Sequence, residues 1–399
     1  MKLNKKGFGV AEMAIVILLI GILAAAVIVG FMGITKQAES AATSQVEIEK
    51  ELINATKHAY PTILSGPISG LEIAVGEYEV YEMGSGSIYQ GSGDCAVVNN
   101  GTLFIKGNGT LDTEHVIFGK SSKNTSIANH RSAFSNNGTL VLSDLVIFAG
   151  QQKASGKSNA ACYAEGGTTT LNNVVINAYN SAVWATGGIV TIDGPNTKLS
   201  NIYTTRTGGH LITIQAVCEV NVKDGLLIAR NGNSWCWNHA GTLTIDGGTF
   251  NTDNIQSTDP YTGLKSQIGA LKYGFLISGG GVVNINGGVF QLNNTETMFQ
   301  FYNVGSQYPF KGTITITGGE FKKSYYNQIP NTFAVDVDKA NGRILEIKDD
   351  PNDGTEQLIF HYAPYKANGT NVWGDYVAEG YEWYKFDGKN LWGVRPKAS

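Results

Sequence analysis

Glu12 is an acidic residue in an apolar segment, where an unpaired carboxylate is energetically unfavourable. It is the single charged side chain in an apolar run from Val10 to about Gly33, and the run follows a basic stretch that ends Lys5-Lys6-Gly7-Phe8. The run is long enough to cross a bilayer. A carboxylate inside hydrocarbon costs several kcal/mol unless it is paired, so we predict a functional role for Glu12 within a transmembrane segment at about residues 10–33.

A second group of residues could bind carbohydrate. Phe134, Tyr163, Trp184 and Trp237 each stand eight residues before the last residue of a recurring phrase, and smaller residues stand nine before it. Adjacent residues of a strand face opposite sides, so one of these two columns points inward and the other outward. If the aromatic column points outward, it forms a surface on which sugar rings stack. If it points inward, it is a stack of core residues, and the sequence leaves both interpretations open.

Residues for metal or catalytic chemistry are sparse. Cys95, Cys162, Cys218 and Cys236 lack zinc-site spacing, and we expect Cys162 and Cys236 to lie too far apart for a disulfide. Asp193 and Asp246 share a position in the repeat, but Lys223 occupies the coil between them, and His115, His130 and His239 are expected on the surface or in loops. We predict no catalytic residue, no metal site and no cofactor. A net charge of −4 argues against nucleic-acid binding.

The apolar run continues into a pattern typical of an amphipathic helix. Apolar residues recur at spacings of three, four or seven from Ile34 to Ala59, and Pro61 then ends the helix. We therefore predict one long helix over residues 8–60. Its outer half requires partners for its apolar stripe.

The segment K-K-G-F-G-V-A-E-M-A-I-V-I-L-L-I resembles the N-terminus of type IV pilins and pseudopilins. The resemblance implies cleavage by prepilin peptidase between Gly7 and Phe8, N-methylation of Phe8, and pairing of Glu12 with the Phe8 amine of a neighbouring pilin subunit during filament assembly. It also implies that the helix anchors the protein in the cytoplasmic membrane before the head is displayed on the cell surface or pilus.

The remainder of the chain carries a repeat. Eight phrases such as G-T-L-F-I alternate apolar and polar residues, which is the pattern of a strand with one buried face. The phrases end at the following anchor residues: Ile105, Leu142, Leu171, Ile192, Val222, Ile245, Ile285 and Ile316. Five residues past their anchors stand Ile147, Ile176, Phe250, Phe290 and Phe321. Variable intervals with one strand per phrase predict a solenoid of stacked coils.

The Gly-rich phrase is similar to that of adhesin-type, right-handed parallel β-helix proteins of the pectate-lyase-like class. The expected organisation is a leader (1–7), the pilin-like helix (8–60), an N-terminal cap (61–94), a β-helix of eight or more coils (95–329) and a C-terminal cap with a hairpin (330–399). An antiparallel sandwich is the alternative fold, although hairpin signals do not recur regularly.

These expectations combine into a non-enzymatic, pilin-like surface protein whose β-helix head binds a glycan or another partner. The alternative is a polysaccharide lyase or hydrolase tethered to the membrane or pilus. A third interpretation is a pseudopilin of a secretion system.

Overall fold

The computed structural model describes residues 36–84, 88–89, 95–107, 116–118, 132–149, 160–178, 180–201, 209–229, 234–252, 273–291, 297–306, 308–322, 332–349, 357–361, 376–386, 389 and 391–397. The chain divides into two compact units, Met1–Thr62 and Ile63–Ser399.

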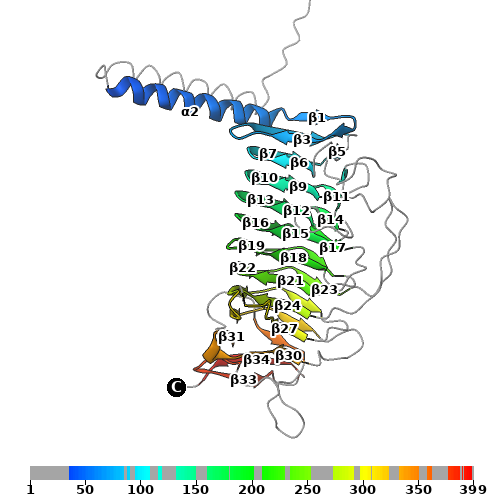
Figure 1. Cartoon of the computed structure of the whole chain (residues 1–399), viewed down its shortest axis with the longest axis vertical. Helices are drawn as coiled ribbons and strands as arrows, with labels where there is room; N and C mark the ends of the chain where they lie inside the picture. Colours follow the sequence, from blue (N-terminus) through cyan, green and yellow to red (C-terminus); the bar gives the residue numbers. More distant parts are fainter. Residues whose placement is uncertain are drawn as a thin grey trace, which may run out of the picture. The chain divides into compact units, whose positions relative to one another are not determined.

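In the first unit the structure describes residues 36–62, of which Lys36–Ala59 form helix α2 (Figure 1). The helix ends two residues before Pro61, as the sequence predicts, and Lys57 and His58 lie in its last turn, where positive charge is favoured by the helix dipole. The expected site residues Gly7, Phe8 and Glu12 and the predicted membrane segment lie outside the described residues. Within the described part of the chain, no helix is both long and apolar enough to span a membrane.

The second unit is built from three sheets whose strands recur in a fixed order, as a β-helix of about ten coils (Figure 1). Sheet A contains β1 (Thr62–Leu64), β4 (Tyr78–Met83), β7 (Thr102–Lys106), β10 (Thr139–Ser143), β13 (Thr168–Asn172), β16 (Ile189–Asp193), β19 (Glu219–Val222), β22 (Thr242–Ile245), β25 (Gly281–Ile285), β28 (Gly312–Ile316) and β31 (Arg343–Ile347).

Sheet B contains β2 (Ile68–Ser69), β5 (Ile88–Tyr89), β8 (Val116–Phe118), β11 (Val146–Ala149), β14 (Val175–Ala178), β17 (Lys198–Asn201), β20 (Leu226–Ile228), β23 (Thr249–Asn251), β26 (Val289–Gln291), β29 (Glu320–Lys322), β32 (Ile359–Phe360), β34 (Trp392–Pro396) and β33 (Tyr381–Lys385). Sheet C contains β3 (Leu71–Ile73), β6 (Cys95–Asn99), β9 (Ser132–Asn136), β12 (Ala160–Ala164), β15 (Ser181–Ala185), β18 (His210–Ile214), β21 (Ser234–His239), β24 (Tyr273–Ser278), β27 (Thr297–Phe301) and β30 (Thr332–Val335). A short 3-10 helix, η3 (Lys339–Asn341), precedes β31.

Each strand of the coils pairs in parallel with the corresponding strand of the next coil, which is consistent with a right-handed parallel β-helix. The eight predicted anchors stack in one column of sheet A, because Ile105, Leu142 and Leu171 pair in register and the later anchors continue the same register. Ile347 on β31 extends this column by one coil. The repeat predicted from the sequence is therefore confirmed as a stack of parallel strands.

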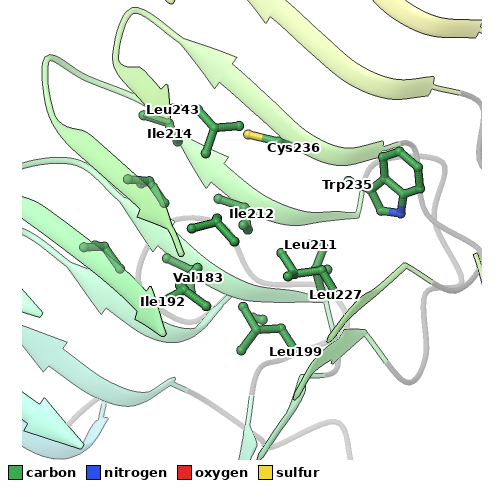
Figure 2. Packing of buried hydrophobic residues seen from close by; sticks show 14 of the residues in the cluster. Val183, Ile192, Leu199, Leu211, Ile212, Ile214, Leu227, Trp235, Cys236 and Leu243 are labelled. Carbon is green, nitrogen blue, oxygen red and sulfur yellow. The ribbon is translucent and has the colours of Figure 1, made fainter. Parts of the chain in front are cut away.

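The core consists of inward columns from all three sheets. In the middle coils Ile192, Leu199 and Ile212 come from sheets A, B and C and are fully buried together (Figure 2). Burial of each such side chain stabilises the fold by about 1.5–3 kcal/mol. In the later coils, four rings of sheet B stack at centroid distances of 5.0, 4.7 and 4.8 Å, in the order Phe250, Phe290, Phe321 and Phe360.

The ladders extend beyond the expected β-helix range of 95–329. Strand β4 pairs with β7 before that range, and β31 and β32 continue sheets A and B after it. The expected C-terminal hairpin corresponds to the antiparallel strands β33 and β34, and β34 joins sheet B next to β32.

Chain length between coils varies mainly in the segments that lead from sheet B to sheet C. These segments run from the single residue Gly70 at the shortest to 252–272 at the longest, whereas the corners between sheets A and B from β10 to β28 are only two to four residues long. Some corners between sheets C and A need a left-handed backbone, as at Gly188, whose φ is 68°. The longest of these segments therefore border the strands of sheet C along the sequence, and the corners between sheets A and B stay short from β10 to β28.

The register of sheet C corrects one sequence prediction. Phe134 is 0% exposed and pairs with Cys162, in the inward column, and it is Ser135 that pairs with Tyr163. Phe134 is thus a core residue and does not belong to an outward aromatic ladder. The position eight residues before the anchor does not mark the same face in every coil, because corners differ in length. The corner before β10, Asn137–Gly138, is one residue shorter than the corner Glu165–Gly167 before β13, and a shift of one residue exchanges the two faces of a strand.

Candidate functional site

The candidate site is the outer face of sheet C. One column of side chains, called the outer column below, follows the strand pairing from coil to coil and comprises Glu72, Val98, Ser135, Tyr163, Trp184, Thr213, Trp237, Leu276, Gln300 and Val335. The small neighbours Cys162 and Cys236 point inward, with exposed fractions of 0% and 1%. Tyr163, Trp184 and Trp237 therefore lie on the face of the sheet away from the core.

The three aromatic residues of the outer column are covered to different extents. Tyr163 and Trp237 are half-buried, whereas Trp184 is only 9% exposed. The rings of Tyr163 and Trp184, on adjacent coils, lie 6.4 Å apart between centroids. Thr213 separates Trp184 from Trp237, so these two tryptophans are two coils apart, roughly 9.6 Å.

Hydrogen bonds orient the polar ends of the outer column. The Trp184 Nε1–H donates to Gln215 Oε1 at 2.9 Å, and the Trp237 Nε1–H donates to Ser278 Oγ at 3.1 Å. In both cases the acceptor belongs to the next coil. Buried indole N–H groups need such partners, and the bonds fix the plane of each ring.

A cluster of four rings surrounds Trp237. His210 lies 5.2 Å and His239 lies 5.8 Å from the Trp237 ring, and Tyr308 meets the edge of His239 at 4.2 Å. Tyr308 is 48% exposed, so this end of the cluster is open to solvent. The cluster joins two coils of sheet C, through β18 and β21, to the segment before β28.

Both histidines of this cluster are buried and bonded to serine. His210 Nδ1 lies 2.7 Å from Ser234 Oγ, and His239 Nδ1 lies 2.7 Å from Ser278 Oγ. Burial lowers the pKa of His210 to about 3 and also lowers the pKa of His239. Both rings are accordingly neutral at neutral pH, and the expectation that His239 is a surface or loop residue is wrong, since it is 3% exposed at the end of β21.

The outer face of sheet C carries few charges. Glu72 on β3 lies in the outer column, and Arg343 lies beside Asp336, whose backbone oxygen accepts a hydrogen bond from Arg343 Nε at 2.7 Å. None of the strands of sheet C contains lysine or arginine. Glu165, after β12, accepts a hydrogen bond from Ser135, and Asp336, after β30, accepts one from Gln300 Nε2 at 2.8 Å. The described part of this face therefore offers carboxylates, amides and hydroxyls around aromatic rings.

Other candidate chemistry is not assembled in the described residues. Asp246 Oδ1 accepts a hydrogen bond from Asn286 at 2.8 Å in an exposed polar row, and no group of three metal-ligating side chains lies close together in the part of the chain that the structure describes. All four cysteines are buried and outside any disulfide, and burial raises the pKa of Cys162 to about 12. His115 and His130 lie outside the described residues.

Sequence reasoning missed the hydrogen-bond partners of the outer column. Gln215 and Ser278 carry no motif, because their role comes from pairing across coils that lie 31 and 41 residues apart. The sequence signal that could have found these acceptors is their position at a strand end, since Gln215 directly follows β18 and Ser278 is the last residue of β24. Comparisons of the chain with protein-family models, curated proteins and solved structures find no significant match.

Proposed function

We propose that this chain is a type IV pilin-like surface protein whose β-helix head binds a glycan through the outer face of sheet C. The observation that carries the proposal is one chain holding both the Gly7-Phe8 junction with Glu12 in the apolar run and a parallel β-helix. The first feature is suited to processing, membrane anchoring and assembly with other pilin subunits. The second supplies a rigid head for display at the cell surface.

Two features of the head support its assignment to the right-handed, pectate-lyase-like class and to a binding role. Its three sheets follow one another in a fixed order through every coil. Tyr163, Trp237 and Tyr308 are partly or fully exposed rings on or beside the outer column, with hydrogen-bonding groups next to them. Aromatic faces flanked by polar groups suit the apolar faces and hydroxyl rims of sugars. Because no group of three metal-ligating side chains lies close together among the described residues, we propose binding rather than cleavage.

Mass spectrometry of the protein extracted from membranes tests the pilin assignment. The expected chain begins at Phe8 with a methylated amine, because the Gly7-Phe8 junction and Glu12 match the pilin pattern. A mature chain that begins at Met1 would overturn the assignment.

A glycan array probed with the full-length protein tests the binding role. Binding to at least one glycan is expected, and replacement of Trp237 by leucine, which keeps an apolar side chain, is expected to weaken it. An array without any bound glycan would contradict the role, whatever the outcome for processing.

A further inference from the structure

His239 carries a buried polar atom that lacks a partner. The residue is 3% exposed at the end of β21, and its Nε2 forms no hydrogen bond within the described part of the structure. The neighbouring buried amide of Asn238 differs, because its nitrogen donates to Gly241 O and Val282 O and its oxygen accepts from Gly241 N. Buried polar groups are normally bonded in this way, so the Nε2 atom of His239 points to a missing partner.

The hydrogen bonds of Ser278 determine where the proton of the His239 ring lies. Ser278 Oγ accepts the Trp237 Nε1–H at 3.1 Å and lies 2.7 Å from His239 Nδ1. A hydroxyl has one O–H to donate, and among the described residues His239 Nδ1 is the acceptor in reach of it. Ser278 therefore donates to Nδ1, and the neutral ring carries its proton on Nε2. The atom that lacks a partner is thus an N–H donor.

The backbone around His239 holds its ring in place. Ala240, the next residue, has a φ of 76°, a left-handed conformation that is strained for a residue with a Cβ. Gly279 of the following coil lies against the ring, and a Cβ there would come within 2.9 Å of His239 Cε1. Strain of this kind persists where the surrounding structure requires it. Here it fixes the imidazole beside the rings of Trp237 and Tyr308.

Tyr308 gives a ligand access to this imidazole. Its ring packs against His239 at 4.2 Å between centroids, yet 48% of the residue is exposed. It belongs to the segment between β27 and β28. Exposed side chains change rotamer rapidly. Rotation of Tyr308 therefore allows a small group to reach the edge of the His239 ring, and the tyrosine ring can then pack against that group.

The groups around His239 favour an acceptor that is neutral and brings no donor. A sugar hydroxyl would add a donor of its own, while the nearest hydroxyl, that of Ser278, is fully buried and already bonded to Trp237 and His239. A carboxylate would be buried without a cation, because burial alone lowers the pKa of His239 and no charged group contributes. A carbonyl oxygen accepts without donating and is uncharged. The acetamido group of an N-acetylated sugar joins such a carbonyl to a methyl group that suits aromatic rings.

Resting on the glycan-binding role proposed above, we propose that His239 forms the centre of a subsite for an N-acetylated sugar. The acetamido carbonyl oxygen accepts the Nε2–H of His239, and the acetamido methyl group packs against the rings of Trp237 and Tyr308. Trp237, Ser278 and His239 then form one chain of hydrogen bonds that ends on the ligand. Bonds in such a chain strengthen one another.

Calorimetric titration of the full-length protein in a polyoxyethylene detergent, which carries no sugar, tests this proposal. The probes are the disaccharides diacetylchitobiose, cellobiose, which has hydroxyl groups in place of the acetamido groups, and digalacturonate, which is anionic. Diacetylchitobiose is expected to bind about two- to tenfold more tightly than either of the others, which corresponds to one added hydrogen bond of ordinary strength.

Variants locate the subsite. His239→Asn keeps an oxygen that can accept from Ser278 but lacks an N–H at the position of Nε2, so the preference for diacetylchitobiose over cellobiose should disappear. His239→Gln, whose amide nitrogen can reach that position, should retain part of the preference. Tyr308→Ala should keep the fold and weaken binding of diacetylchitobiose by up to about tenfold, through loss of a ring contact. Tyr302→Ala, at a 47% exposed residue of the same segment, is the matched control and should bind like the unmodified protein.

The outcomes separate this proposal from the broader one. Equal affinity for cellobiose, or tighter binding of digalacturonate, would overturn the assignment to an N-acetylated sugar and leave a glycan-binding head. A preference that persists in a folded His239→Asn variant would overturn the location. If urea unfolding shows that His239→Asn does not fold, Tyr308→Ala decides, and unchanged affinity in that variant overturns the location. If none of the three disaccharides binds, the proposal fails, and the glycan array decides whether the binding role fails with it.

Discussion

Acid should destabilise the β-helix head through His210. The ring is 7% exposed, its Nδ1 is bonded to Ser234, and burial lowers its pKa to about 3 from the usual value near 6.5. Between these two values the unfolded chain binds a proton at His210 and the folded chain does not. Stability contributed by the neutral ring is thus fully present above pH 6.5 and is lost as the pH falls towards 3.

The size of the effect follows from linkage. One proton bound by the unfolded state alone changes the free energy of unfolding by up to about 1.4 kcal/mol per pH unit. Because the unfolded histidine is only half protonated at pH 6.5, the change between pH 6.5 and 4.5 is roughly 2.3 kcal/mol. The pKa of His239 is also lowered by burial, so this residue acts in the same direction. The combined slope of the unmodified protein should therefore exceed that of one histidine.

Urea unfolding followed by tryptophan fluorescence measures this slope. The Trp237 ring lies 5.2 Å from His210, so the signal reports on the region concerned. His210→Asn retains a group that can bond Ser234 but cannot gain a proton near neutral pH. It should lower stability at every pH and reduce the slope between pH 6.5 and 4.5 by up to about 1.4 kcal/mol per unit.

His58→Asn, at an exposed position near the end of α2, controls for removal of an imidazole as such, and the comparison rests on the difference between the two variants. If His210→Asn and His58→Asn give the same slope, the folded head does not exclude a proton from His210 and the reasoning is refuted.

Three further predictions follow from features of the fold and the sequence. Phe134→Ala should lower the free energy of unfolding, measured with urea, by about 3–5 kcal/mol, because it leaves a cavity in the core. Tyr302→Ala, at a 47% exposed residue, should change it by no more than about 0.5 kcal/mol, and equal effects of the two variants would contradict the register of sheet C. The four buried thiols should resist alkylation at pH 8 in the folded protein and react after unfolding, and fast labelling of Cys162, whose pKa is raised to about 12, would contradict its burial. Glu12→Ala should reduce the amount of protein found in sheared filaments while the head still unfolds at the usual urea concentration; filaments at the usual level would show that Glu12 has no pairing role.

The strands of sheet A could be predicted from the sequence, because their apolar and polar residues alternate strictly. The anchors from Ile105 to Ile316 were predictable because each phrase alternates inward and outward residues and ends on an inward one, and the anchors stack in register. The outer column was harder to predict, because its distance from the anchor depends on the length of the corner between sheets C and A. One residue fewer before β10 places Phe134 in the core, while Tyr163 stays on the outer face.

The partners across coils could not be predicted at all. Trp184 and Gln215 lie 31 residues apart in the sequence, and the number of residues between β17 and β18, 202–209, is independent of their contact. The same holds for Trp237 and Ser278, which are separated by a longer insertion at 253–272. Such contacts depend on which strands pair, and a single sequence does not reveal that pairing.

The parallel ladders also determine how the head would respond to a mechanical pull. Backbone hydrogen bonds between coils, such as those joining β13 to β16, point along the stacking direction, so tension in that direction opens them one coil after another rather than all at once. A coil such as the 21 residues from Leu171 to Ile192 would release about 70 Å of extended chain. A head under load would therefore lengthen in steps. We expect single-molecule stretching to record a series of small unfolding events, in which a coil with a longer insertion releases a longer stretch of chain.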